Sequence, residues 1–246
     1  MRNQKRFITS PKQQEIVNQD FVSIVLLAEN SGHRMKSYGP MPLLSIGGKT
    51  VLEKQIDIIK SCFLDFEILL CCGFESLKIA TYVKETFSNI NIRIVENQIY
   101  NNSNSCESVR LCLNNTMNDK ILIYNMDLML DPIHLRKFDF STSAVLTQAN
   151  DNNNNMEIGV THNFNTLENI SIGIKSDRWT EVSFLSGKPI IESLQSILSC
   201  IEYKNKFIFE GLIELIKLHK LKTIDVSEVP IYKISNTKIL KGINYR

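Results

Sequence analysis

Short apolar runs alternate with amphipathic segments along the first half of this chain, and this alternation restricts the possible folds more than any other feature. Residues 21–28 and 66–72 are almost continuously apolar and have the length of strands. Runs of this kind are typical of strands that are buried on both faces of a parallel sheet. Between them, residues 49–60 carry apolar side chains at helical spacing, namely Val51, Leu52, Ile56 and Ile59.

The same alternation continues to about residue 127. A helix is predicted over residues 74–87, with Phe74, Leu77, Ala80, Val83 and Phe87 on its inner face. The spacing further predicts a strand over 90–95, a helix over 106–113 and a strand over 120–124. Repeated strand–helix units of this length predict a mainly parallel sheet with helices on both faces.

The pattern changes after Ser143. Four short strands follow without helices between them, at residues 144–148, 156–160, 170–175 and 180–185. We interpret the Asn-rich stretch 150–155 as a hairpin loop between the first two. Two helices (189–201 and 209–219) and two short strands (222–226 and 230–234) complete the chain.

The expected fold class is therefore a three-layer α/β/α sandwich with a mixed, mostly parallel central sheet. A small β-rich extension is expected at about residues 144–185. Residues 1–20 are polar and are expected to form an arm, and residues 21–246 a single domain.

Composition and charge exclude several classes of function. The chain has 246 residues, 43% of them hydrophobic, which is too apolar for a disordered protein. With 28 basic and 26 acidic residues the net charge is +2, so nothing in the charge favours a nucleic acid partner. No apolar run approaches the ~18 residues that a membrane span requires, and membranes are not expected as partners.

The cysteines and the first residues of the chain indicate the cellular compartment. The basic start of the chain is not followed by the apolar stretch of a secretory signal. The six cysteines form no C-x-x-C pair, so we expect reduced, mostly buried thiols and a cytoplasmic location. The sequence is also compatible with a homo-oligomer.

A glycine-bearing loop and a proline-rich stretch follow the first predicted strand. The segment 26–35 reads L-L-A-E-N-S-G-H-R-M, and the segment 40–49 reads P-M-P-L-L-S-I-G-G-K. At these residues the chain resembles the nucleotidyltransferases with a GT-A-like fold. These include the sugar-phosphate and choline-phosphate nucleotidyltransferases and the MobA-like group. Their signature is L-A-A-G-x-G-x-R-L followed by P-K-P-L-L-x-x-x-G-K-P-L-L-E.

The resemblance continues downstream, to about residue 241. Residues 70–74 resemble the family's V-V-T-G-Y, and residues 97–108 resemble its N-P-x-Y…N-x-x-x-S-L segment. Asn125, Met126 and Asp127 stand where the family has a strand-end G-D whose Asp binds magnesium. Phe209 and Glu210 resemble its Y-E-D-x-I.

The resemblance implies a function and a set of residues for it. It implies transfer of NMP from an NTP to a small phosphorylated acceptor, with Mg²⁺ as cofactor and release of pyrophosphate. Arg34 would be the catalytic cation on the triphosphate, because its guanidinium is a planar fork for phosphate. Asp127 lies at the carboxyl end of a buried strand, as expected for a ligand site in an open α/β sheet. The remaining implied residues are Ala28, Asn30, Gly32, Asn104 and Ser108 for the nucleotide or acceptor, and Asp225 as a second metal ligand.

Four departures from the signature support an alternative. Glu29 and Asn30 replace an Ala and a Gly, Met41 replaces the phosphate-binding Lys, and Ser235 replaces a magnesium-binding Asp. Asp225 is a candidate to replace the carboxylate missing at Ser235, and Lys36, Lys175 or Lys188 is a candidate to replace the charge missing at Met41. The alternative is a catalytically degenerate relative that acts as a binding or assembly module. A GT-A glycosyltransferase is a third interpretation, but it would require a D-x-D pair, which the sequence lacks.

Simpler structural roles stand beside these functional ones. Gly32 and Arg34 could form only a turn and a surface charge, and Asp127 could begin a turn before Asp131. Asn104 is a good N-cap for the helix predicted at 106–113. Trp179 is expected in the core.

Overall fold

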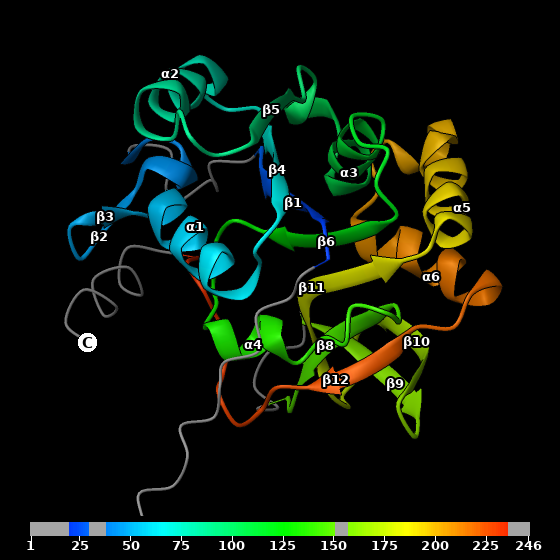
Figure 1. Cartoon of the computed structure of the whole chain (residues 1–246). Coiled ribbons are helices and arrows are strands. Elements are labelled where there is room, and N and C mark those ends of the chain that lie inside the picture. The colour runs from blue at the N-terminus through cyan, green and yellow to red at the C-terminus, as the bar shows by residue number, and fades with distance from the viewer. Residues whose placement is uncertain (1–19, 30–37, 151–156, 236–246) are drawn as a thin grey trace, which may run out of the picture.

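The structure is a computed structural model that describes residues 20–29, 38–150 and 157–235. A nine-stranded sheet crosses the whole molecule, in the order β5-β4-β1-β6-β11-β8-β12-β10-β9 (Figure 1). Its strands are β1 (Val22–Ala28), β4 (Phe66–Cys72), β5 (Ile92–Glu96), β6 (Lys120–Asn125), β8 (Ala144–Gln148), β9 (Ile158–Asn163), β10 (Thr166–Ile172), β11 (Arg178–Ser186) and β12 (Lys222–Asp225).

The first four sheet neighbours are parallel, and the rest are mixed. β1 pairs with both β4 and β6 in parallel, and all seven of its residues are buried. β11 then runs antiparallel to β6 and β8. Within the predicted β-rich segment, β8 and β11 belong to the middle of this mixed sheet, and β9 and β10 form one edge of it.

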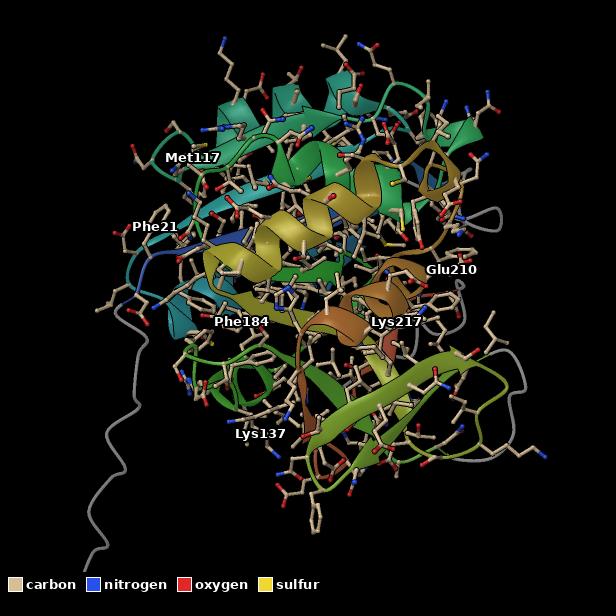
Figure 2. All side chains as sticks on the ribbon, turned by 90° about the vertical axis from the view of Figure 1, so that its right-hand side faces the viewer. Phe21, Met117, Lys137, Phe184, Glu210 and Lys217 are labelled. Atoms are coloured by element: carbon tan, nitrogen blue, oxygen red, sulfur yellow. The ribbon has the colours of Figure 1, made fainter. Side chains whose placement is uncertain are left out.

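Helices cover both faces, which confirms the three-layer prediction (Figure 1). One core packs α1, α2 and α4 on the sheet, and the other packs α3, α5 and α6. Figure 2 shows α5 and α6, in yellow and orange, lying across the second face. The helices are α1 (Val51–Cys62), α2 (Ser76–Thr86), α3 (Ser105–Leu113), α4 (Pro132–Arg136), α5 (Lys188–Ser199) and α6 (Ile208–Leu218).

The alternation of side chains in β4 shows how one strand supplies both cores. Cys72 belongs to the first core and Cys71 to the second, because successive side chains of a strand point to opposite faces. All six cysteines are free, and all but Cys200 are buried. Trp179 is buried as predicted.

The register predicted for the second helix is wrong at one position. Leu77 is 80% exposed, whereas Ile79 is fully buried. α2 begins at Ser76, after Glu75 in a left-handed conformation (φ 52°), which is two residues later than predicted, while Val83 is buried as predicted.

Smaller elements complete the chain, and one of them, the strand at residues 232–233, lies within the strand predicted at 230–234. Short 3-10 turns also lie at η2 (Met41–Leu43), η3 (Tyr100–Asn102) and η4 (Ile201–Tyr203). A two-stranded ladder joins β7 (Leu128–Met129) to β13 (Tyr232–Lys233), and a second joins β2 (Ser45–Ile46) to β3 (Lys49–Thr50). Among the described residues, no helix is long and apolar enough to span a bilayer.

Candidate active site

A cavity of about 520 Å³ opens at the carboxyl ends of β1 and β6. This is the edge at which open α/β sheets bind ligands, and the volume suits a small molecule. β11 and β13 close its other sides. The described residues that line it are Leu27, Ala28, Glu29, Met41, Asn104, Ser105, Asn125, Asp127, Ile158, Ile172, Glu181, Phe207, Phe209, Lys233, Ile234 and Ser235.

Asp127 is a buried carboxylate in the wall of this cavity, and its charge interacts with those of its neighbours. It follows β6 directly, and its carboxylate oxygen Oδ1 is buried without a hydrogen-bond partner. Burial raises the pKa of Asp127 to about 7; the nearby Lys233 acts against this rise, and Glu181 and Glu29 add to it. A buried carboxylate oxygen that lacks a partner is costly, and a cation or a proton would relieve that cost.

Lys233 and Glu181 form an ion pair beside Asp127. The Lys233 ammonium nitrogen lies 2.6 Å and 2.7 Å from the two Glu181 carboxylate oxygens, and 3.8 Å from Oδ2 of Asp127. Asn125 donates a hydrogen bond from Nδ2 to the same Glu181 carboxylate. Burial acts to lower the pKa of Lys233, but the charges of Asp127 and Glu181 outweigh it and raise that pKa above its usual value.

Glu181 occupies an unusual backbone position. Its φ is 66°, in the left-handed region, and the β11–β8 register shifts between Trp179 and Ser183. A β-bulge of this kind redirects a side chain that would otherwise follow the alternation of the strand. Here the redirected side chain is one that reaches the cavity.

Glu29 is a second buried carboxylate on the cavity wall, and only 5% of its surface is exposed. Burial raises its pKa, while a backbone hydrogen bond and the Ser108 hydroxyl oppose the rise. The Ser108 hydroxyl also accepts a hydrogen bond from Asn97 Nδ2 at 3.0 Å. Glu29 is thus held by a buried polar network that includes two residues of the 97–108 segment.

The described residues that were predicted to bind the nucleotide or acceptor lie in the cavity wall or directly behind it. Ala28 and Asn104 line the cavity. Asn104 is also the N-cap of α3, and its side chain accepts a hydrogen bond from the Ser105 amide at 3.0 Å. Ser108 lies behind the wall, where it contacts Glu29 and Asn97. Arg34, Asn30 and Gly32 lie outside the described residues.

Asp225 is placed away from this cavity. It ends β12, and its Oδ1 accepts hydrogen bonds from the Ser227 amide and hydroxyl, so it forms a turn. It is not among the described lining residues, and the carboxylates that accompany Asp127 there are Glu29 and Glu181. Asp225 therefore does not join Ser235 in the lining of the cavity, because β11 and β8 lie between β12 and β6 in the sheet.

Three of the departures in the signature gather in the cavity. Glu29, Met41 and Ser235 all line it, although they come from distant parts of the chain. The Ile234 amide donates to the Asp127 carbonyl at 2.8 Å, which fixes the last described residues against the end of β6. Three positions at which the residues differ from the signature therefore share one cavity.

Sequence reasoning missed Glu181 and Lys233. A charged residue inside the apolar stretch 179–185 was a local signal for Glu181, and Lys233 lies two residues before Ser235. Neither residue belongs to the quoted motifs, and only the β7–β13 pairing brings Lys233 to Asp127.

Comparison with solved structures gives a consistent answer. A CTP:phosphocholine cytidylyltransferase from Streptococcus pneumoniae superposes with a TM-score of 0.75 at 16% identity, over 91% of this chain and 98% of that chain. An inositol-1-phosphate CTP transferase from T. maritima gives 0.74 at 13% identity, over 90% and 94%. The chain has the nucleotidyltransferase fold. A UDP-glucose pyrophosphorylase complexed with UDP-glucose gives 0.72 at 10% identity, over 92% and 98%.

Sequence comparison gives no further assignment. No family profile and no curated protein sequence matches the chain. The nucleotidyltransferase fold is thus established by the structure, and the activity has to be argued from the cavity.

Proposed function

We propose that this protein is a nucleotidyltransferase that transfers NMP from an NTP to a small phosphorylated acceptor. The observation that carries the proposal is Asp127, whose unpartnered buried oxygen lies at the carboxyl end of β6 in the cavity of a nucleotidyltransferase fold. The sugar-phosphate and choline-phosphate substrates of the similar structures fit a cavity of this size.

The donor set at Asp127 fits Mg²⁺ as cofactor. Among the residues described, no three acidic, His or Cys side chains cluster closely enough to hold a metal by themselves. Mg²⁺ is commonly bound through one or two carboxylates together with substrate phosphates and water. Oδ1 of Asp127 can serve as that carboxylate oxygen, while Oδ2 faces Lys233. When bound, the ion would neutralise charge on the triphosphate.

The chain's own contribution is positioning and charge. Ala28 and Asn104 would border the nucleotide, together with Asn30 and Gly32 of the loop, and Arg34 would hold the triphosphate as the catalytic cation. Ser108 would act from behind the wall by fixing Glu29. An acceptor phosphate oxygen forms a bond to the α-phosphorus, and the bond from that phosphorus to the bridging oxygen breaks. The electron pair leaves with pyrophosphate, and catalysis rests on alignment and charge neutralisation.

A second candidate function rests on the same cavity. Met41 and Ser235 lie in it without the charges of the signature, and buried Glu29 adds an acidic group. Loss of one charge-assisted contact to phosphate typically costs ~1.5–3 kcal/mol. These residues favour a degenerate binding or assembly module over a GT-A glycosyltransferase. We further place the protein in the cytoplasm, because free, mostly buried thiols are typical of reducing compartments.

Thermal unfolding of the full chain with each NTP, with and without Mg²⁺, tests the proposal. A ligand at 100 times its Kd adds ~2.7 kcal/mol, which raises the Tm by several degrees for a chain of this length. We expect a Mg²⁺-dependent rise with at least one NTP, and no Mg²⁺ dependence in Asp127→Asn. Pyrophosphate release with phosphocholine, inositol phosphate and sugar phosphates then identifies the acceptor. If no NTP at millimolar concentration shifts the Tm, the binding-module alternative replaces this function.

A further inference from the structure

The cavity contains a lysine that the signature does not place there. The residue at the phosphate-binding Lys position is Met41, and its side chain lines the same cavity as Lys233. Within the described part of the cavity wall, Lys233 is the one Lys or Arg. Lys188, a substitute considered from the sequence, instead pairs with Glu192 at the surface, with 78% of its side chain exposed.

The way Lys233 is held leaves it able to bind a ligand. An ammonium group has three N–H donors. The two Glu181 carboxylate oxygens, at 2.6 Å and 2.7 Å, use two of them. Oδ2 of Asp127 lies at 3.8 Å, which is beyond hydrogen-bond length. Since 40% of the Lys233 side chain is exposed, a ligand oxygen can reach the remaining donor.

The charge of the cavity indicates what that ligand oxygen should belong to. Glu29, Asp127 and Glu181 are acidic, so an anionic ligand is repelled unless cations accompany it. A lysine fixed by one carboxylate provides a point charge for a phosphate oxygen without a further loss of side-chain freedom. Oδ1 of Asp127 then remains available to bind a cation.

We propose that Lys233 is the phosphate-binding lysine of this cavity, replacing from β13 the charge that is lacking at Met41, and that Glu181 is its positioning residue. The proposal rests on the proposed function, since it concerns the phosphates of the same nucleotide. It differs from a purely structural role, in which the Lys233–Glu181 pair only fastens β13 to β11.

Binding of a phosphate series to the full chain separates these two roles. Calorimetry in EDTA would compare a nucleoside with its mono-, di- and triphosphate, together with inorganic tripolyphosphate, so that the lysine is measured apart from any divalent cation. We expect Lys233→Met to weaken binding of the triphosphate and of tripolyphosphate by about 10- to 100-fold, the effect of one charge-assisted contact. Nucleoside binding should stay unchanged, as should every ligand with the control Lys222→Met, which removes a surface lysine paired with Asp139.

Two further variants complete the test. In Lys233→Met/Met41→Lys, the charge returns to the cavity from another element, and most of the triphosphate affinity should return. Lys233→Arg keeps the charge and should keep the phosphate dependence, which tests the proposal even if Lys233→Met does not fold.

The outcomes separate this inference from the proposed function. If Lys233→Met weakens binding of the nucleoside and of the triphosphate equally, the role of Lys233 is structural and the inference is overturned. The inference is also overturned if the variant binds the triphosphate as tightly as the wild type. If the wild type binds tripolyphosphate through Lys233 in EDTA but no NTP raises its Tm with Mg²⁺, the inference stands and the proposed function falls. If it neither binds tripolyphosphate in EDTA nor responds to any NTP with Mg²⁺, both fall.

Discussion

The ammonium nitrogen of Lys233 lies 3.8 Å from Oδ2 of Asp127 because β13 pairs with β7, the strand that begins directly after Asp127. Two residues that are distant in sequence thus meet at the carboxyl end of β6. The other carboxylate oxygen of Asp127, Oδ1, is buried without a hydrogen-bond partner. Ionising this buried carboxylate therefore costs free energy, which should appear in how stability depends on pH.

Asp127→Asn should alter how stability depends on pH. The pKa of Asp127 is raised in the fold to about 7, from about 4 in an unfolded chain, so the folded state binds the proton more tightly. Stability of the wild type therefore falls as pH rises from about 4 to about 7, by at most about 4 kcal/mol. Urea unfolding without divalent cations should show the Asp127→Asn variant gaining stability relative to the wild type across this window. An equal offset at pH 5 and pH 8 would contradict the shifted pKa.

Ser108→Ala should destabilise the protein, most of all at alkaline pH. The hydroxyl stabilises buried, ionised Glu29 and accepts a hydrogen bond from Asn97, so its loss should cost about 1–3 kcal/mol. Because the pKa of Glu29 is raised by burial, Glu29 also contributes a loss of stability as pH rises, and Glu29→Gln should lose less stability over that range than the wild type. Ser103→Ala is the matched control, since Ser103 contacts Asn97 at 3.1 Å. Equal losses from both serine variants would argue against a special role for Glu29.

The backbone of Glu181 provides a test that does not depend on its charge. Glu181→Gly and Glu181→Ala both remove the carboxylate, but only Gly adopts φ near 66° without strain. The Gly variant should be the more stable of the two by about 1 kcal/mol in chemical denaturation. At Ser183 in the same strand the order should reverse, with Ala the more stable. Greater stability of Ala at position 181 would disprove the strain.

Gly73→Ala should disturb the packing next to the cavity. A Cβ at this residue would lie 2.5 Å from Cγ of Tyr100 and 2.8 Å from the Glu29 carbonyl oxygen. Overpacking of this kind costs about 1–3 kcal/mol, which equilibrium unfolding can measure. Removing the ring in Gly73→Ala/Tyr100→Ala should recover only part of the loss, because the contact with the Glu29 backbone remains. Full recovery would place the strain in the tyrosine alone.

Local patterns in the sequence determined most of the first half of the fold. The almost continuous apolar runs over residues 21–28 and 66–72 coincide with β1 and β4 to within one residue, because burial on both faces of a sheet demands such runs. The N-cap preference of Asn104 was also readable, since it depends on its immediate neighbours. α2 begins two residues later than predicted, and Ile79 rather than Leu77 is buried against the sheet.

The sequence also determined that Asp127 ends a buried strand and that Met41 and Ser235 depart from a nucleotidyltransferase signature, because each is a local property of the chain. Only the tertiary structure decided which side chains share a cavity. The bulge at Glu181 and the β7–β13 ladder bring Glu181 and Lys233 to Asp127, whereas Asp225 ends in a turn elsewhere. Strand pairing and bulges join segments that are remote in sequence, so no local pattern contains the information that places them together.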